Sequence, residues 1–143
     1  MIVVDASVVI EVLLGTAAGR AVEGRLFDPR AALHAPHLVD VEVAHVLRRY
    51  AAAGELTPAR AAEAVEDLRD LPMTRHEHVM LLPRMWQLRR NLTAYDAAYV
   101  ALADALDATL LTCDGKLARA AGRTRPLIAR KTCRPSSSVV STA

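Results

Sequence analysis

Short apolar runs alternate along this chain with longer segments in which apolar residues recur about every 3.6 positions. Residues 2–4 and 109–112 are continuous, largely β-branched or leucine-rich runs, a pattern typical of strands buried on both faces of a parallel sheet. A third strand is expected within 31–37. Residues 73–78 are either a short polar strand or a connector.

The segments between these runs are predicted to be helical. At 8–14 more strand is the alternative, and we favour a helix because Asp5 and Ser7 offer caps just before it. The other helices are expected at 17–26, 38–53, 57–72, 79–92, 93–106 and 115–121. In 38–53 the apolar positions close to a 3.6 period are Leu38, Val41, Leu47, Tyr50 and Ala51, and in 57–72 the expected buried stripe is Ala61, Val65, Leu68 and Leu71. The alternation indicates an α/β sandwich with a short, mostly parallel central sheet.

Length and charge divide the chain into two parts. The 143 residues favour one domain, which we place at 1–121. Residues 122–143 form a basic, Ser-rich segment with no acid, in which 126–129 is a candidate last strand and the rest is expected to be disordered. Residues 1–121 hold 13 of the 18 basic residues and all 16 acidic ones, a net charge of −3. The domain is therefore not a nucleic-acid clamp by bulk charge, so phosphate attraction must come from local patches or bound metal.

Several protein classes are disfavoured by composition. Two cysteines make no disulfide framework. The N-terminus has no basic region before its apolar stretch, and no segment has the length of uncharged apolar residues that a membrane span needs. We therefore expect a cytoplasmic protein that does not enter the membrane.

Two acidic residues follow the two clearest strands. Asp5 comes after 2–4, and Asp114 comes shortly after 109–112. In open parallel sheets, ligands bind outside the carboxyl ends of the strands. Glu42 and Asp96 lie in helices that are otherwise rich in apolar residues. Each of the four, alone, is as readily explained as a helix cap or a surface charge. Together, carboxylates near apolar faces repel one another, and a hard divalent cation relieves that repulsion.

The ordered set of segments around these acids resembles the PIN-domain ribonucleases of the VapC toxin type. The segments are 2–9 (IVVDASVV), 40–43 (DVEV), 46–49 (VLRR), 93–103 (TAYDAAYVALA) and 110–118 (LLTCDGKLA). The likeness covers residues 1 to about 121 and implies a PIN-like α/β/α sandwich. Members of this family usually end with a short strand, and the basic, Ser-rich ending of this chain departs from that pattern. The only candidate for that strand is 126–129.

The resemblance implies roles for particular residues. Asp5 and Asp96 would be principal ligands of Mg²⁺, for which Mn²⁺ can substitute, and Glu42 and Asp114 would complete the acidic quartet. Ser7 and Thr112 match small hydroxyl positions that orient ligands or water. The implied activity is metal-dependent hydrolysis of RNA to a 5′-phosphate and a 3′-hydroxyl. The implied partners are a cognate VapB-like antitoxin and a second copy of the chain in a homodimer.

Several residues also permit other interpretations. Arg48, Arg49 and Lys116 are candidate RNA contacts, with a solvated surface as the alternative. His76 and His78 are expected to be surface histidines, and Cys113 a buried thiol. The competing functions are a binding-only PIN fold, a phosphoacceptor receiver domain and a structure-specific DNA nuclease. A receiver would need two adjacent acids after strand one, and Asp5-Ala6 does not supply them.

Overall fold

A computed structural model describes residues 1–121 and 127–128 of the chain. Its strands form one parallel sheet in the order β3-β2-β1-β4-β5. The strands are β1 (Ile2–Val4), β2 (Leu33–Pro36), β3 (Thr74–His76), β4 (Thr109–Thr112) and β5 (Leu127–Ile128). The register pairs Val3 with Leu110 across the centre of the sheet. The predicted fold class is confirmed, and the predicted last strand is present at Leu127–Ile128 beside β4.

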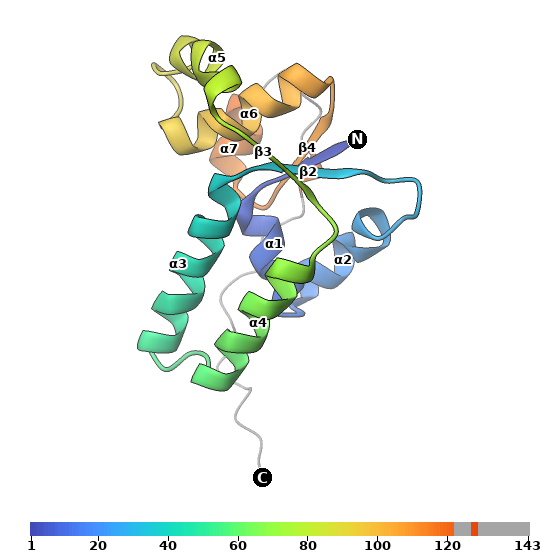
Figure 1. Ribbon diagram of the computed structural model, residues 1–143, viewed down its shortest axis with the longest axis vertical. Coiled ribbons are helices and arrows are strands. Elements are labelled where there is room, and N and C mark those ends of the chain that lie inside the picture. The colour runs from blue at the N-terminus through green and yellow to red at the C-terminus, as the bar shows by residue number, and fades with distance from the viewer. Residues whose placement is uncertain (122–126, 129–143) are drawn as a thin grey trace.

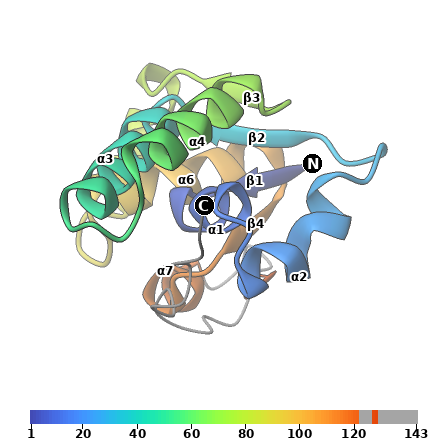
Figure 2. The same cartoon turned by 90° about the horizontal axis from the view of Figure 1, so that it is seen from below.

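Helices lie on both sides of this sheet. They are α1 (Ala6–Leu13), α2 (Ala17–Leu26), α3 (Leu38–Ala52), α4 (Pro58–Asp70), the 3₁₀ turn η1 (Val79–Leu81), α5 (Leu82–Gln87), α6 (Ala94–Leu106) and α7 (Gly115–Ala120). Figure 1 shows α5 and α6 above the sheet and α1 to α4 below it. The view from below shows α4, α1 and α2 side by side across that face (Figure 2).

The core is built from small and branched apolar side chains, as the low aromatic content predicts. Val3 and Leu110 are fully buried in the central strands, and Val4 and Leu111 are 1% exposed. Every residue of α6 from Ala97 to Ala103 is buried. The alanines of this helix let its backbone approach the sheet closely, so α6 contacts β1, β2 and β4 together.

Side-chain caps fix where the helices begin. Thr57 accepts a hydrogen bond from the Arg60 backbone N–H at 3.1 Å, and Thr93 accepts one from the Asp96 N–H at 3.2 Å. Asp5 and Asp114 cap α1 and α7 in the same way. Each cap satisfies an N–H group that has no partner within its own helix. The segment 8–14 is therefore a helix, as predicted, rather than a continuation of β1.

The predicted buried stripe of α4 and one predicted helix are wrong in part, and one periodic apolar position of α3 faces solvent. Val41 is 71% exposed and Val65 is 43% exposed, because α3 and α4 turn other residues to the core. The buried residues are Val39, Val43 and Leu47 in α3, and Ala64 and Leu68 in α4. The predicted helix at 79–92 is divided into η1 and α5, and α5 ends at Gln87. Pro83 lies at the start of α5 and lacks the N–H that a continuous helix would need there.

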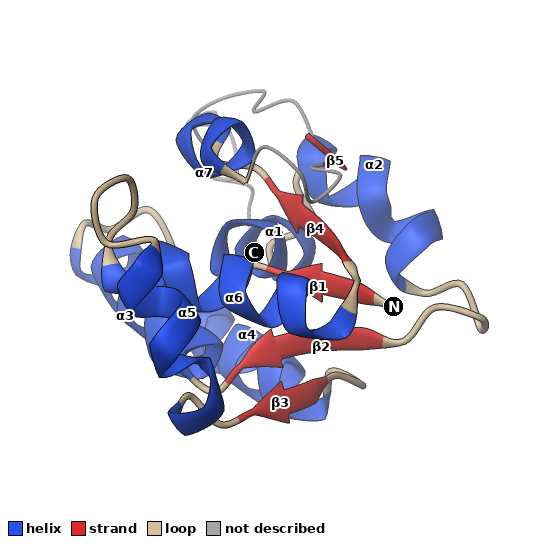
Figure 3. Ribbon diagram, turned by 90° about the horizontal axis from the view of Figure 1, so that it is seen from above, coloured by secondary structure: helices blue, strands red, loops and turns tan. Residues whose placement is uncertain are grey.

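The parallel topology gathers four helix N-termini at one edge of the sheet. Because α1, α3 and α7 directly follow strands β1, β2 and β4, they begin at the carboxyl ends of those strands. Helix α6 leads back into β4, so it runs against the strands and begins at the same edge. Figure 3 shows this edge between α3, α6 and α7. No helix within the described residues is both long and apolar enough to cross a membrane.

Candidate metal centre

Each of these four helices carries one of the predicted acidic residues at its cap or within its first two turns. Asp5 and Asp114 are the N-caps of α1 and α7. Asp96 lies in the first turn of α6, and Glu42 lies in the second turn of α3. The partial positive charge at a helix N-terminus favours a nearby carboxylate. The cap interpretation of Asp5 and Asp114 is thus confirmed, and it is compatible with a shared site.

Asp5 is the buried centre of this group. Its side chain is 4% exposed. One carboxylate oxygen accepts a hydrogen bond from the Ser7 hydroxyl at 2.5 Å and one from the Val8 backbone N–H at 3.2 Å. The other oxygen accepts from the Thr112 hydroxyl. These three donors fix the orientation of the carboxylate, which is what a pre-organised ligand needs.

The same two hydroxyls connect Asp5 to the loop after β4. The Ser7 oxygen accepts from the Cys113 backbone N–H at 2.9 Å, and the Thr112 oxygen accepts from the Asp114 N–H at 2.9 Å. Each hydroxyl therefore donates to Asp5 and accepts from the segment that leads into α7. This double bridge sets Asp114 relative to Asp5, and it gives Ser7 and Thr112 a defined place in the site.

The solvent exposure of the four acids increases from Asp5, at the buried centre of the group, to Asp114, at its solvent-exposed rim. Glu42 and Asp96 are half-buried, and Asp114 is exposed. One oxygen of Asp114 accepts hydrogen bonds from the Lys116 N–H at 2.7 Å and the Leu117 N–H at 3.4 Å. Its second oxygen has no hydrogen bond to the described residues. The group therefore opens to solvent on the Asp114 side.

Mutual repulsion shows that the acids share one electrostatic environment. Burial raises the pKa of Asp5, although hydrogen bonds from Ser7 and Thr112 oppose the rise. Burial also raises the pKa of Glu42, and the charges of Asp5 and Asp96 raise it further. The pKa of Asp96 is raised by burial and by the charge of Asp114. Asp5, Glu42 and Asp96 are therefore destabilised as anions by burial, and Glu42 and Asp96 also by the charge of a neighbouring acid.

No basic side chain of the described residues forms an ion pair with these four acids. None of the ion pairs in this part of the chain includes Asp5, Glu42, Asp96 or Asp114. Carboxylate oxygens held together without a basic partner are a donor set suited to a hard divalent cation. Within the described residues, no three His, Cys, Asp or Glu side chains are arranged as a ready metal cage. Mg²⁺ is commonly bound in proteins by one or two carboxylates and keeps several waters.

Tyr99 belongs to this environment, although it is not among the candidate site residues predicted from the sequence. It lies one turn after Asp96 on α6 and is 2% exposed. Its hydroxyl donates a hydrogen bond to a Glu42 carboxylate oxygen. Burial and the hydrogen bond to Glu42 raise its pKa, so the hydroxyl stays protonated as a donor. The available signal was its spacing of three residues from Asp96, which places both on one helix face.

The three predicted RNA contacts lie at different places. Lys116 is in the first turn of α7, and its backbone N–H is bonded to Asp114. Arg48 and Arg49 are exposed in the second half of α3. Arg48 is six residues beyond Glu42, or roughly 9 Å along the helix axis, and α3 extends away from the sheet (Figure 1). The structure therefore brings Lys116 to the rim of the acidic group and leaves the two arginines farther away.

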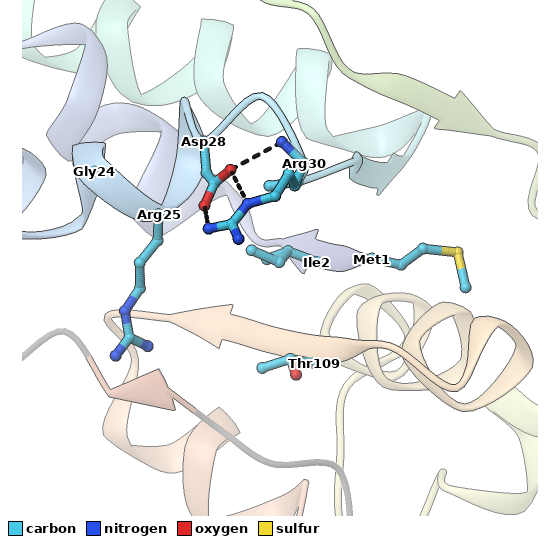
Figure 4. A pocket seen from close by; sticks show the side chains of 8 residues that line it. Met1, Ile2, Gly24, Arg25, Asp28, Arg30 and Thr109 are labelled. Atoms are coloured by element: carbon cyan, nitrogen blue, oxygen red, sulfur yellow. Dashed lines mark hydrogen bonds and ion pairs between the residues drawn. The ribbon is translucent and has the colours of Figure 1, made fainter.

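A hollow elsewhere on the surface does not contain any of the four acids. It is lined by Met1, Arg25, Asp28 and Thr109 among others, at the amino ends of β1 and β4 (Figure 4). Arg30 is paired with Asp28 there at 2.9 Å. Because Asp5 and Asp114 follow the carboxyl ends of the same strands, the hollow lies at the opposite edge of the sheet.

The expectation that His76 and His78 are surface histidines is wrong. Both are half-buried. Nε2 of His76 lies 2.9 Å from Nδ1 of His34, and Nε2 of His78 accepts from the Leu38 N–H at 3.3 Å. These contacts join β3 to β2 and to the start of α3. Cys113 is buried, as predicted.

Comparison with known proteins assigns the chain to a class. The family model described as "PIN domain" matches residues 2–123. The chain therefore belongs to the PIN-domain family. In fold it is similar to a solved structure, the protein PAE2754 of Pyrobaculum aerophilum, with a TM-score of 0.61 and 20% identity over 83% of each chain.

Proteins of similar sequence assign the chain to a narrower group within this family. The chain is 44% identical over 117 residues to Ribonuclease VapC9 of Mycobacterium tuberculosis, which covers 82% of this chain and 88% of that one. It is 45% identical over 121 residues to Ribonuclease VapC1 of the same organism, covering 84% and 90%. Within the PIN-domain family, the chain therefore belongs with the VapC ribonucleases.

Proposed function

We propose that this protein is a metal-dependent endoribonuclease that acts as the toxin of a VapBC-type toxin–antitoxin pair. The observation that carries the proposal is the group of four carboxylates at the caps or in the first two turns of four helices. One of them is buried, and no basic side chain of the described residues is paired with them. The names of its sequence relatives support RNA as the substrate.

The proposed ligands of Mg²⁺ or Mn²⁺ are Asp5 and Asp96, with Glu42 and Asp114 completing the group. A cation of this kind supplies positive charge to a phosphodiester and lowers the pKa of a water molecule. Asp5 is suited to binding because its three hydrogen-bond donors already hold it in one orientation. Asp114 is suited to the solvent-facing side, where a phosphate can approach.

The substrate's negative charge must be accommodated by a domain whose own net charge is negative. Residues 1–121 sum to −3, so general attraction of RNA is weak and local groups must supply it. We assign this role to the bound cation and to Lys116 at the rim, with Arg48 and Arg49 as contacts for more distant phosphates. The expected products are a 5′-phosphate and a 3′-hydroxyl.

Two macromolecular partners form part of the proposal, a VapB-like antitoxin and a second copy of the chain. The VapC names of the relatives support the first. Exposed apolar side chains support association, since η1 and α5 present Val79, Met80, Leu82 and Trp86 with exposures of 53–84%. Clustered exposure of this kind marks interaction surfaces. The proposed location is the cytoplasm.

Cleavage of RNA under metal control tests the catalytic proposal. The purified protein is incubated with single-stranded RNA in EDTA, then with excess Mg²⁺ or Mn²⁺, and the product ends are analysed. We expect no cleavage in EDTA and cleavage on adding either metal. An equal rate in EDTA would contradict metal dependence. Single-stranded DNA of the same sequence is the control that separates a ribonuclease from a DNA nuclease.

A further inference from the structure

Tyr99 joins three separate parts of the acidic site. It projects from α6, and its hydroxyl donates to Glu42 of α3. The backbone amide of Ala6, the residue after Asp5, interacts with the Tyr99 oxygen. Glu42 is 57 residues from Tyr99 in sequence. A single buried hydroxyl therefore relates the Glu42 carboxylate to the start of α1.

Tyr99 is the donor in this hydrogen bond, and Glu42 is the acceptor. A phenol so deeply buried, and next to a carboxylate, stays protonated and can only donate to Glu42. The bond occupies one oxygen of Glu42 and restricts its rotation, so the second oxygen has a defined direction. Asp5 is held in a comparable way by Ser7 and Thr112. Glu42 has no other side-chain partner among the described residues.

We infer that Tyr99 is a positioning residue that holds Glu42 in the orientation needed for binding a divalent cation. The inference rests on the proposed function, because it assigns Glu42 to the metal site. The role assigned to Tyr99 is exerted through Glu42, not as a metal ligand or an RNA contact. Hydrogen-bonding partners of metal ligands typically change metal affinity or activity by about 10–100-fold when they are removed.

Tyr99→Phe removes the hydroxyl and keeps the ring. Mn²⁺ binding to the RNA-free protein is measured by calorimetry, and urea unfolding in EDTA checks the fold. We expect Mn²⁺ affinity to fall by about 10–100-fold, with RNA cleavage needing correspondingly more Mn²⁺. The matched control is Tyr50→Phe, because Tyr50 is a half-buried tyrosine of α3 whose hydroxyl has no hydrogen bond to the described residues. The control is expected to bind Mn²⁺ as the wild type does.

A double-mutant cycle with Glu42→Gln separates positioning from general weakening. If Tyr99 acts through Glu42, then adding Tyr99→Phe to Glu42→Gln lowers Mn²⁺ affinity much less than the single change does. Wild-type affinity in Tyr99→Phe, or an equal further loss in the double variant, would overturn the inference. Loss of the fold in Tyr99→Phe would overturn it too, because it would assign the residue to the core.

The outcomes separate this inference from the proposed function. If the wild type binds Mn²⁺ but does not cleave RNA, the proposed function fails while the binding ratios still decide the role of Tyr99. If the wild type cleaves RNA and Tyr99→Phe binds Mn²⁺ with unchanged affinity, the inference fails alone. A wild type that does not bind Mn²⁺ overturns both.

Discussion

The Thr112 hydroxyl, at the end of β4, donates a hydrogen bond to the carboxylate of Asp5, 107 residues earlier in the chain. Thr112 is completely buried, and its oxygen also accepts from the Asp114 N–H. The two central strands are thus joined at their carboxyl ends by a bond between side chains of the site. Thr112 therefore supports both the packing of the two central strands and the orientation of Asp5.

Replacing Thr112 with valine keeps the shape of the side chain and removes the hydroxyl. Asp5 then loses a donor and the Asp114 N–H loses its acceptor, so we expect the free energy of unfolding to fall by about 1–3 kcal/mol. RNA cleavage is expected to fall by about tenfold or more. Urea unfolding and initial cleavage rates measure the two effects. Thr112→Ser, which keeps the hydroxyl, should remain close to the wild type in both, and equal losses in the two variants would contradict this role.

The raised pKa of Asp5 predicts how stability depends on pH without metal. At pH values between the ordinary pKa of an aspartate and the raised pKa of Asp5, the folded protein binds more protons than the unfolded chain. Stability from this group is therefore present at low pH and is lost as pH rises through that window. We expect the wild type to gain stability relative to Asp5→Asn as pH falls from neutral towards the ordinary pKa of an aspartate.

Urea unfolding in EDTA at several pH values measures this difference, with Asp5→Asn cancelling the contributions of histidines and other groups. The stability of the wild type relative to Asp5→Asn is expected to rise steadily as pH falls. A difference that stays constant with pH would contradict the raised pKa. Adding Mn²⁺ at pH 7.5 should stabilise the wild type, and less so at pH 5, because protons compete for the same oxygens.

Gly19 is expected to be essential for the packing of α2 against α1. A Cβ atom at this position would lie 2.2 Å from the carbonyl oxygen of Glu11 in the backbone of α1. Gly19→Ala should therefore destabilise the protein by about 1–3 kcal/mol or more. Gly24, in the same helix, has open space around it, so Gly24→Ala should stabilise by about 0.5–1 kcal/mol. Thermal unfolding compares the two, and a stable Gly19→Ala would contradict the close approach of the helices.

The sequence predicted best those features that depend on local chemistry. Caps and continuous apolar runs placed β1, β4 and most of the helices. The topology rule for parallel sheets then placed Asp5 and Asp114 at one edge. These predictions succeeded because each depends on neighbouring residues or on a general rule of parallel sheets.

The features that the sequence failed to predict are decided by contacts between residues far apart in the chain. Valines at 39, 41 and 43 offer α3 more than one apolar face, and its packing against α1 and α4 selects Val39 and Val43. The His34–His76 contact joins residues 42 positions apart, and the Tyr99–Glu42 bond joins residues 57 apart. No local pattern encodes such pairs, so the polar supports of the site became visible only in the structure.

RNA cleavage by Asp96→Asn, compared with Asp107→Asn, tests the central claim most directly. Both changes remove one negative charge from an aspartate of α6 or its C-cap. Asp107 has a φ of 47°, which asparagine adopts readily, so its variant should fold and cleave RNA as the wild type does. Asp96→Asn should keep the fold and lose more than about 100-fold in the Mn²⁺-dependent rate, since even partners of metal ligands contribute about 10–100-fold. Cleavage by Asp96→Asn at the wild-type rate would contradict the proposed metal centre.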